Sequence, residues 1–156
     1  MGQKTLILGL GNELFCDDAV GLYVVRELAR LLDRERFEVI ESPFTGLRLL
    51  ELVEGYPRLV IIDAINLVGA EPGEVRRVDL NALRGANRID SAHDVDLATA
   101  LDMGRRLNLN MPDHVVAYGI QVEDPYTMKE GLSDTLQRAL PDIVAHIAAE
   151  LENADA

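Results

Sequence analysis

The feature that most constrains this chain is a glycine-rich stretch near its N-terminus, residues 5–21. It opens with the apolar run Leu6 to Leu10, which is too short for a helix and suits a buried strand. Gly9 and Gly11 allow a sharp exit from that strand, and the periodic apolar run from Ala19 to Leu32 predicts a helix. The stretch therefore predicts a strand, a glycine turn, a short loop and a helix.

Two adjacent carboxylates, Asp17 and Asp18, stand directly before the predicted helix. The dinucleotide-binding fingerprint needs a third glycine three residues after the second, and that position holds Leu14. A phosphate binds bare N–H groups at a helix N-terminus, which is where this chain has two acids instead. The acids either cap the helix and offset its dipole, or they bind a cation.

Strand-like and helix-like segments alternate along the rest of the chain. We expect strands at residues 37–41, 59–62, 74–78 and 115–120. We expect helices at residues 47–54, from Asp94 or Asp96, either of which can start the helix, to 107, and from Ser133, as its cap, towards 150. Residues 74–78 alternate polar with apolar, which is typical of an exposed edge strand. The pattern predicts an α/β three-layer sandwich. Its sheet is expected to be twisted and mostly parallel, with about five strands, one antiparallel edge strand and helices on both faces. We expect residues 1–156 to form a single domain with a frayed tail at 153–156.

Composition narrows the partners and the compartment. The formal net charge of −12 argues against nucleic acid and against an anionic membrane surface. A lone cysteine, Cys16, excludes an internal disulfide and fits a reducing cytosol. The N-terminal apolar run is broken by glycine and Asn12, and no stretch approaches a transmembrane span. We expect a cytoplasmic protein, monomeric because its charge is high and no apolar surface stripe is evident.

Parallel α/β sheets bind ligands at the carboxyl ends of their strands, and three candidate ligands fall there. Asp18 follows the first strand, Asp63 closes the third, and His93 lies in a loop that can reach the same edge. Two carboxylates and one imidazole with open positions suit a divalent metal that must accept a further ligand. The alternatives are that Asp63 accepts hydrogen bonds from loop amides and that His93 is solvent-exposed.

Several short motifs also occur in one order along nearly the whole chain. This ordered set resembles the hydrogenase maturation endopeptidases, which trim the C-terminal tail of the large subunit of nickel–iron hydrogenases. The residues that carry this resemblance are Gly9-Leu10-Gly11-Asn12, Asp17-Asp18-Ala19-Val20-Gly21, Thr45-Gly46, Leu59 to Ala64, Pro72-Gly73-Glu74-Val75, Ser91-Ala92-His93, Gly119-Ile120 and Glu123.

The resemblance implies a partner and roles for particular residues. Asp18, Asp63 and His93 would contact nickel already inserted in the [NiFe] hydrogenase large-subunit precursor, so the metal arrives with the substrate and no organic cofactor is expected. Thr45 and Gly46 are expected to contact the substrate. Because His93 must be neutral to bind a metal, engagement is expected to weaken as pH falls through its pKa, normally about 6.5.

The group that breaks the peptide bond is less defined by the sequence. No Gly-x-Ser-x-Gly and no His-Glu-x-x-His motif is present. Asp17 and Glu123 are the candidate catalytic residues, as groups that activate a water molecule. Cys16, with His93 as its base, is an alternative nucleophile, but the favoured interpretation of Cys16 is a small apolar loop residue without a catalytic role.

Two other classes of function stay open. Gly9-x-Gly11 and Glu41, at the end of the second strand, are compatible with a nucleotide-binding Rossmann-like enzyme. The second alternative is a non-catalytic chaperone of flavodoxin-like shape that binds a metallated partner without cleaving it.

Overall fold

The computed structural model describes residues 3–42, 46–83 and 96–154. Its strands are β1 (Thr5–Leu10), β2 (Phe37–Ser42), β3 (Arg58–Ile65), β4 (Val75–Val78) and β5 (His114–Gln121). Its α-helices are α1 (Val20–Leu31), α2 (Leu49–Val53), α3 (Leu97–Arg106) and α4 (Asp134–Ala154). Short 3₁₀ helices are η1 (Cys16–Ala19), η2 (Gly46–Arg48) and η3 (Leu80–Ala82).

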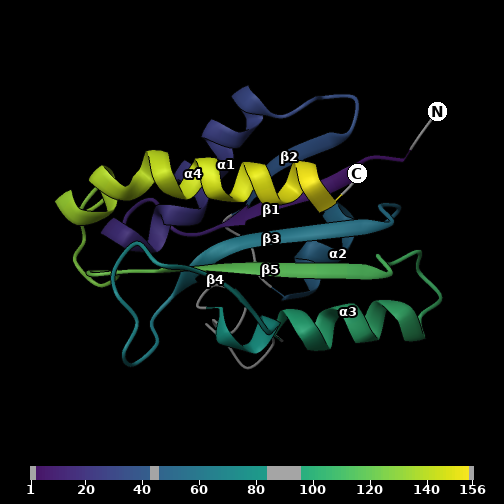
Figure 1. The fold of residues 1–156 in the computed structure, drawn as a ribbon. Coiled ribbons are helices and arrows are strands. Elements are labelled where there is room, and N and C mark those ends of the chain that lie inside the picture. The colour runs from purple at the N-terminus through teal and green to yellow at the C-terminus, as the bar shows by residue number, and fades with distance from the viewer. Residues whose placement is uncertain (1–2, 43–45, 84–95, 155–156) are drawn as a thin grey trace.

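The strands form one sheet in the order β2-β1-β3-β5-β4. The pairs β1–β2, β1–β3 and β3–β5 are parallel, and the edge strand β4 is antiparallel to β5. Helices α1 and α4 cover one face, while α2 and α3 cover the other (Figure 1). The predicted three-layer sandwich, its mostly parallel sheet and its antiparallel edge strand are thus confirmed.

Both faces of the sheet are packed with aliphatic side chains. Along β1, Ile7 joins the core beneath α1 and α4, while Leu6 and Leu8 join the core beneath α2 and α3. A strand buried on both faces reads as a continuous apolar run, which is why β1 and β3 were visible in the sequence. Burying each such side chain stabilises the fold by about 1.5–3 kcal/mol.

Two boundaries differ from the sequence-based expectation, and both differences affect the acids. β3 does not end at residue 62: it continues through Asp63, which pairs with Gly119, to Ile65. The separate turn η1 contains Asp17 and Asp18, and α1 begins after it with no side-chain cap at its N-cap residue Ala19. The interpretation of the two aspartates as caps of this helix is therefore wrong.

Other helix starts agree with the sequence. The backbone N–H of Thr99 donates to the Asp96 carboxylate over 2.8 Å, which caps α3. The Ser133 hydroxyl accepts from the N–H of Leu136 over 3.4 Å at the start of α4. Among the residues that the structure describes, no helix is both long and apolar enough to cross a membrane.

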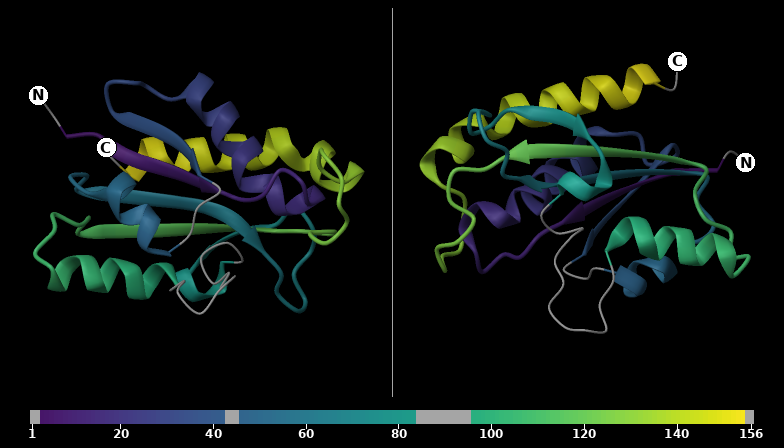
Figure 2. Two further views of the ribbon diagram at one scale, coloured as in Figure 1. Left: turned by 180° about the vertical axis from the view of Figure 1, so that it is seen from behind. Right: turned by 90° about the horizontal axis from the view of Figure 1, so that it is seen from below.

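The strand order creates a switch point between β1 and β3. The chain leaves β1 through α1 on one face to reach β2, then returns through α2 on the opposite face to reach β3 on the other side of β1. In open α/β sheets, the crevice beyond the carboxyl ends of such strands is where ligands bind. The connections after β1, β3 and β5 gather at this end of the sheet, on the left in Figure 1, and again at one end in both views of Figure 2.

Candidate functional site

Two buried carboxylates flank the switch point, as the sequence predicts. Asp18 lies in η1, in the connection that follows β1, and Asp63 lies within β3. Asp63 alternates with Ile62 and Ala64, which belong to the core under α1 and α4. Its side chain therefore belongs to the opposite face of the sheet, the one that carries α2 and α3.

Two glycines let η1 and α1 approach the strand ends closely. A Cβ on Gly21 would lie 2.4 Å from the carbonyl oxygen of Ile62 and 2.5 Å from that of Leu10. A Cβ on Gly11 would lie 2.5 Å from the carbonyl oxygen of Asp18. Because real Cβ atoms do not tolerate such distances to backbone, both positions require glycine, and this packing sets Asp18 beside the ends of β1 and β3.

Asp17 is an anchor for a distant loop. It is fully buried, and its Oδ2 accepts hydrogen bonds from the N–H groups of Glu123 (3.1 Å) and Asp124 (2.9 Å). Ser133 donates to it twice, from its N–H over 2.7 Å and from its hydroxyl over 2.8 Å. These bonds offset the cost of burying the charge and tie the connection between β5 and α4 to η1. They are the contacts of a structural carboxylate, and the catalytic role predicted for Asp17 stays a prediction.

Asp18 and Asp63 are likewise withdrawn from solvent, with exposed fractions of 1% and 0%. Asp18 accepts from the N–H of Asn12 over 3.2 Å, and Asp63 accepts from the N–H of Ala64 over 2.8 Å. Within the described ranges, no group of three His, Cys, Asp or Glu side chains lies close enough to hold a metal ion. The third predicted ligand, His93, lies outside those ranges, so the predicted triad remains untested.

The remaining predicted site residues are distributed as follows. Glu123 is exposed, just beyond the end of β5. Cys16 is buried, and desolvation together with the charge of Asp17 raises the pKa of its thiol, which weakens it as a nucleophile. Gly46 begins η2, after the end of β2, whereas Thr45 lies outside the described residues.

A cavity of about 410 Å³ opens beside Asp18 at the carboxyl ends of β1 and β2. Its lining consists of Gly11, Asn12, Glu13, Leu14, Leu22, Glu41 and Ser42. Arg26 forms ion pairs with both Glu13 and Glu41, so one guanidinium binds two of the acids that line the cavity. Because its lining combines apolar side chains with acids, this cavity disfavours a phosphate.

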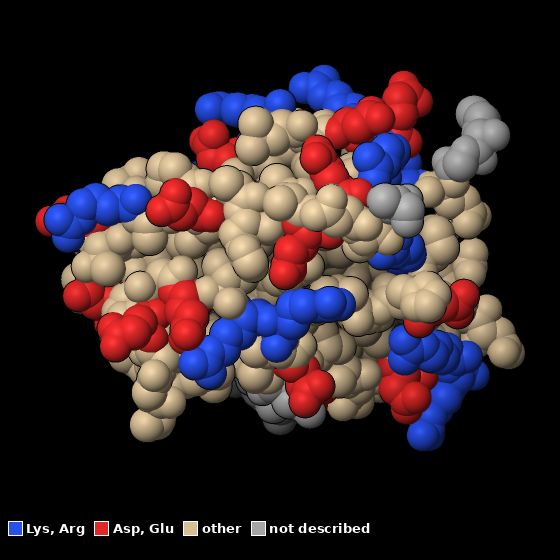
Figure 3. Space-filling model, viewed as in Figure 1, with Lys and Arg blue, Asp and Glu red and all other residues tan. Residues whose placement is uncertain are grey.

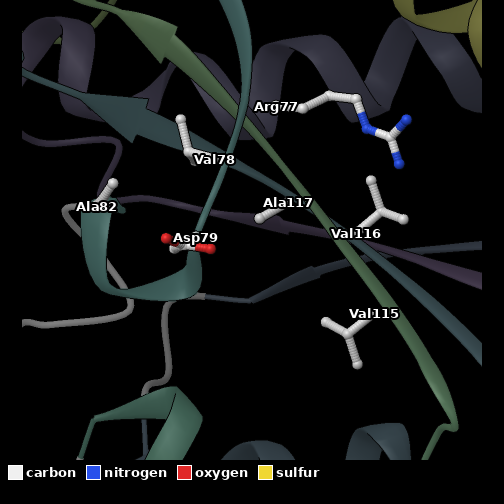
Figure 4. Close-up of a pocket in the computed structure, with 7 residues that line it drawn as sticks. All are labelled: Arg77, Val78, Asp79, Ala82, Val115, Val116 and Ala117. Carbon is white, nitrogen blue, oxygen red and sulfur yellow. The ribbon is translucent and has the colours of Figure 1, made fainter.

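A larger cavity, of about 510 Å³, lies elsewhere, between η3, β4 and the first half of β5 (Figure 4). Its lining is mostly aliphatic, and Figure 4 shows the guanidinium of Arg77 well separated from the carboxylate of Asp79. Arg77 instead stacks over the ring of Tyr118, with 6.0 Å between Cζ and the ring centroid. This cavity does not bring together groups that could carry out acid–base chemistry or bind a metal.

The sequence did not reveal two residues that hold the site together. Ser133 was expected only to cap α4, yet its hydroxyl also donates to Asp17. Asp124 accepts from the N–H groups of Tyr126 and Thr127, both over 3.0 Å, and from the Thr127 hydroxyl. An Asp followed by Thr at the third position is a recognisable turn pattern, but its link to Asp17 spans more than 100 residues and leaves no local trace.

The geometry also bears on nucleotide binding. The N–H of Asn12, in the glycine turn where a dinucleotide phosphate would approach, already donates to the Asp18 carboxylate. A phosphate there would meet a buried negative charge instead of an open amide, which disfavours the Rossmann-like alternative.

Comparison with known proteins gives a consistent result. The sequence profile described as hydrogenase maturation protease matches residues 22–150. A putative hydrogenase maturation protease of Methanocaldococcus jannaschii is 33% identical, over 96% of this chain and 97% of its own length.

Solved structures agree with the sequence comparison. The hydrogenase maturating endopeptidase HybD from Escherichia coli superposes with a TM-score of 0.77 at 25% identity, covering 97% of this chain and 93% of that one. The [NiFe] hydrogenase maturation protease HybD from Thermococcus kodakarensis gives a TM-score of 0.64 at 26% identity, covering 95% and 98%. The resemblance inferred from the ordered motifs is confirmed: the chain belongs to the hydrogenase maturation protease family.

Proposed function

We propose that this protein is an endopeptidase that removes the C-terminal extension of a nickel-loaded [NiFe] hydrogenase large-subunit precursor. Membership of the family supports the peptidase class and the hydrogenase partner. The observation that carries the proposal is the pair of buried acids, Asp18 and Asp63, on either side of the switch point between β1 and β3.

Nickel would be recognised as cargo of the substrate, through Asp18, Asp63 and His93. Two carboxylates without solvent around them are stabilised by a cation. Leu83 and Leu97 are the buried residues nearest in sequence to the two ends of segment 84–95 within the described ranges. Both belong to the core on the sheet face that carries Asp63. This placement supports including His93 in the same ligand set.

Recognition would include a conformational step. Asp18 and Asp63 are 1% and 0% exposed, so a metal held by another protein reaches them once neighbouring segments of the edge move aside. We propose that docking of a loaded precursor drives this opening, since the nickel brings a positive charge to the two acids. A precursor without nickel gains nothing from the opening and is cleaved slowly.

For the hydrolytic step, we favour Glu123 over Asp17 as the group that activates water. Glu123 is exposed at the carboxyl edge and its backbone N–H is fixed by Asp17. Asp17 is enclosed by donors from the chain itself and has no approach to a water molecule at the substrate. The peptide tail would then lie along the 410 Å³ cavity between Asn12 and Ser42. The substrate contacts of Thr45 and Gly46 stay a prediction from the sequence.

The proposal is tested with precursor prepared with and without nickel, mixed with the protein and followed by mass spectrometry. Loss of a C-terminal peptide from the loaded form alone is expected. Asp63→Asn is expected to lower the cleavage rate by about 10- to 100-fold, as for other changes at a metal contact. Binding without any mass loss would identify a chaperone instead, and equal cleavage of both forms would contradict nickel recognition.

A further inference from the structure

The carboxyl edge of the sheet exposes an apolar surface that the proposed cleavage chemistry does not use. Among the described residues, the three most exposed large hydrophobic side chains are Val68 (106%), Met128 (75%) and Tyr126 (67%), and all three lie in connections at this edge. Leu14, 53% exposed, lies at the same edge and also lines the cavity beside Asp18. We call these four side chains the apolar rim.

Hydrogen bonds join the segments that carry the apolar rim. The N–H of Lys129 donates to the carbonyl of Leu14 over 2.9 Å, which places the segment of Met128 next to that of Leu14. The amide of Asn66 donates to the Tyr126 hydroxyl over 3.3 Å, which links the loop after β5 to the loop that carries Val68. Three connections far apart in the sequence thus adjoin one another, and each carries an exposed apolar side chain.

The surface is held in place before any partner arrives. Asp124 fixes the turn that carries Tyr126, and the N–H of Asp124 is in turn fixed by the buried Asp17. Asn66 is further held by Gln121, whose amide donates to it over 3.1 Å. Because a fixed surface loses little conformational entropy on association, exposed apolar groups on it are well suited to docking.

Acidic residues surround the apolar rim. Glu71, Glu123 and Glu130 are exposed in the same connections, where the one exposed cation within the described residues is Lys129. Glu13 is exposed there too and is paired with Arg26 of α1. Figure 3 shows the tip of the loop between β3 and β4, at the lower left, without charged side chains and with both acidic and basic side chains nearby. The formal net charge of −12 acts against a second copy of this chain as the occupant.

We propose that the apolar rim docks the folded body of the protein substrate, through a surface that carries apolar residues bordered by Lys and Arg. The inference rests on the proposed function, because it names where the part of the precursor that is not cut away binds this protein. The apolar rim would provide affinity for that body, and Asp18 and Asp63 would then bind the metal if it is present. Docking and metal recognition would contribute separately to substrate binding, through neighbouring parts of the same edge of the sheet.

The test compares two sets of apolar-to-serine changes that differ in location. The first is the triple variant Val68→Ser/Tyr126→Ser/Met128→Ser, which leaves out Leu14 because that side chain also lines the cavity proposed for the peptide tail. The control is Leu31→Ser/Leu107→Ser, whose side chains are 60% and 66% exposed and lie at the ends of α1 and α3, away from the carboxyl edge. Urea unfolding confirms that each variant is folded before KM and kcat are measured on nickel-loaded precursor.

The expected result is a rise in KM of about tenfold or more for the triple variant, with kcat within about twofold of wild type. The control is expected to match wild type, and added salt is expected to raise the wild-type KM. An unchanged KM for the triple variant, or an equal rise for the control, would overturn the proposal while wild-type cleavage stands. A wild-type dimer that the triple variant dissociates would overturn it as well, whereas no wild-type cleavage at all would count against the proposed function itself.

Discussion

The two ends of the sheet are built in different ways. At the amino end, connections are closed by backbone hydrogen bonds, such as Gly55 N–H to the carbonyl of Asn110 (2.8 Å) and Asp113 N–H to that of Pro57 (3.0 Å). Its charges are exposed, as in the ion pair of Lys4 and Glu38. At the carboxyl end, within the described residues, the carboxylates of Asp17, Asp18 and Asp63 are buried. Burying charged groups is unusual and costly for folding, which marks the carboxyl end as the functional one.

Adjacent acids at the carboxyl end have different surroundings. Asp17 accepts hydrogen bonds from Glu123, Asp124 and Ser133, and it thereby fixes the connection after β5 to η1. Asp18 and Asp63 each accept a backbone N–H, from Asn12 and Ala64, and flank the switch point. We infer that one acid maintains the structure so that the other two can serve recognition.

The largest loss of stability is expected at Asp17, which ties the connections at the carboxyl end together. Asp17→Ala would leave the N–H groups of Glu123, Asp124 and Ser133 without their acceptor, so we expect a loss of about 3 kcal/mol or more in the free energy of unfolding. Asp102→Ala, which removes an exposed ion pair with Arg106, is the matched control and should change stability by about 0.5 kcal/mol or less. Urea denaturation measures both, and similar losses would refute the anchoring role.

A second difference between the ends concerns close packing at glycine. Gly21→Ala places a Cβ against two backbone carbonyls, which cannot move aside, and should cost about 2 kcal/mol or more. Gly104→Ala, in α3, places it 2.7 Å from the sulfur of Met111, the end of a flexible side chain, and the gain in helix propensity offsets part of the strain. Thermal unfolding should therefore show a clear loss for the first variant and a change within about 1 kcal/mol for the second. The reverse order would contradict the close approach of α1 to β3.

The smallest effect is expected at the turn that carries the apolar rim. Hydrogen bonds from the Thr127 hydroxyl and from the N–H groups of Thr127 and Tyr126 hold the pKa of Asp124 below its usual range. A carboxyl with a lowered folded-state pKa contributes stability above its unfolded pKa, about 3.9, and that contribution is lost as pH falls through the folded value. Thr127→Val should thus be slightly less stable than wild type at pH 7, with a difference that shrinks towards pH 3. A difference independent of pH would show that the Asp124 charge is not involved.

Sequence reasoning succeeded where the relevant forces are local. Apolar runs located β1 and β5, alternation identified the edge strand β4, and Asp96 and Ser133 were recognised as helix caps. Carboxyl-edge placement followed from the order of the elements, and the structure indeed sets Asp18 and Asp63 at the switch point.

What could not be predicted depends on partners far away in the sequence. β3 extends past Asp63 because β5 continues to pair with it as far as Gln121, and a single strand's pattern does not show its neighbour's length. The bonds from Ser133 to Asp17 cross 116 residues. The exposure of Val68 and Met128 was equally invisible, since an apolar residue in a loop reads the same whether it is buried or not.

The central claim is that Asp18 and Asp63 recognise a metal that the substrate carries. Its most direct test is the ratio of dissociation constants for nickel-free and nickel-loaded precursor, measured by titration calorimetry with wild type and with Asp63→Asn. The account predicts that wild type binds the loaded form about tenfold or more tightly and that Asp63→Asn loses most of this preference while still binding the nickel-free form as wild type does. A preference for the loaded form that survives in Asp63→Asn undiminished would contradict it.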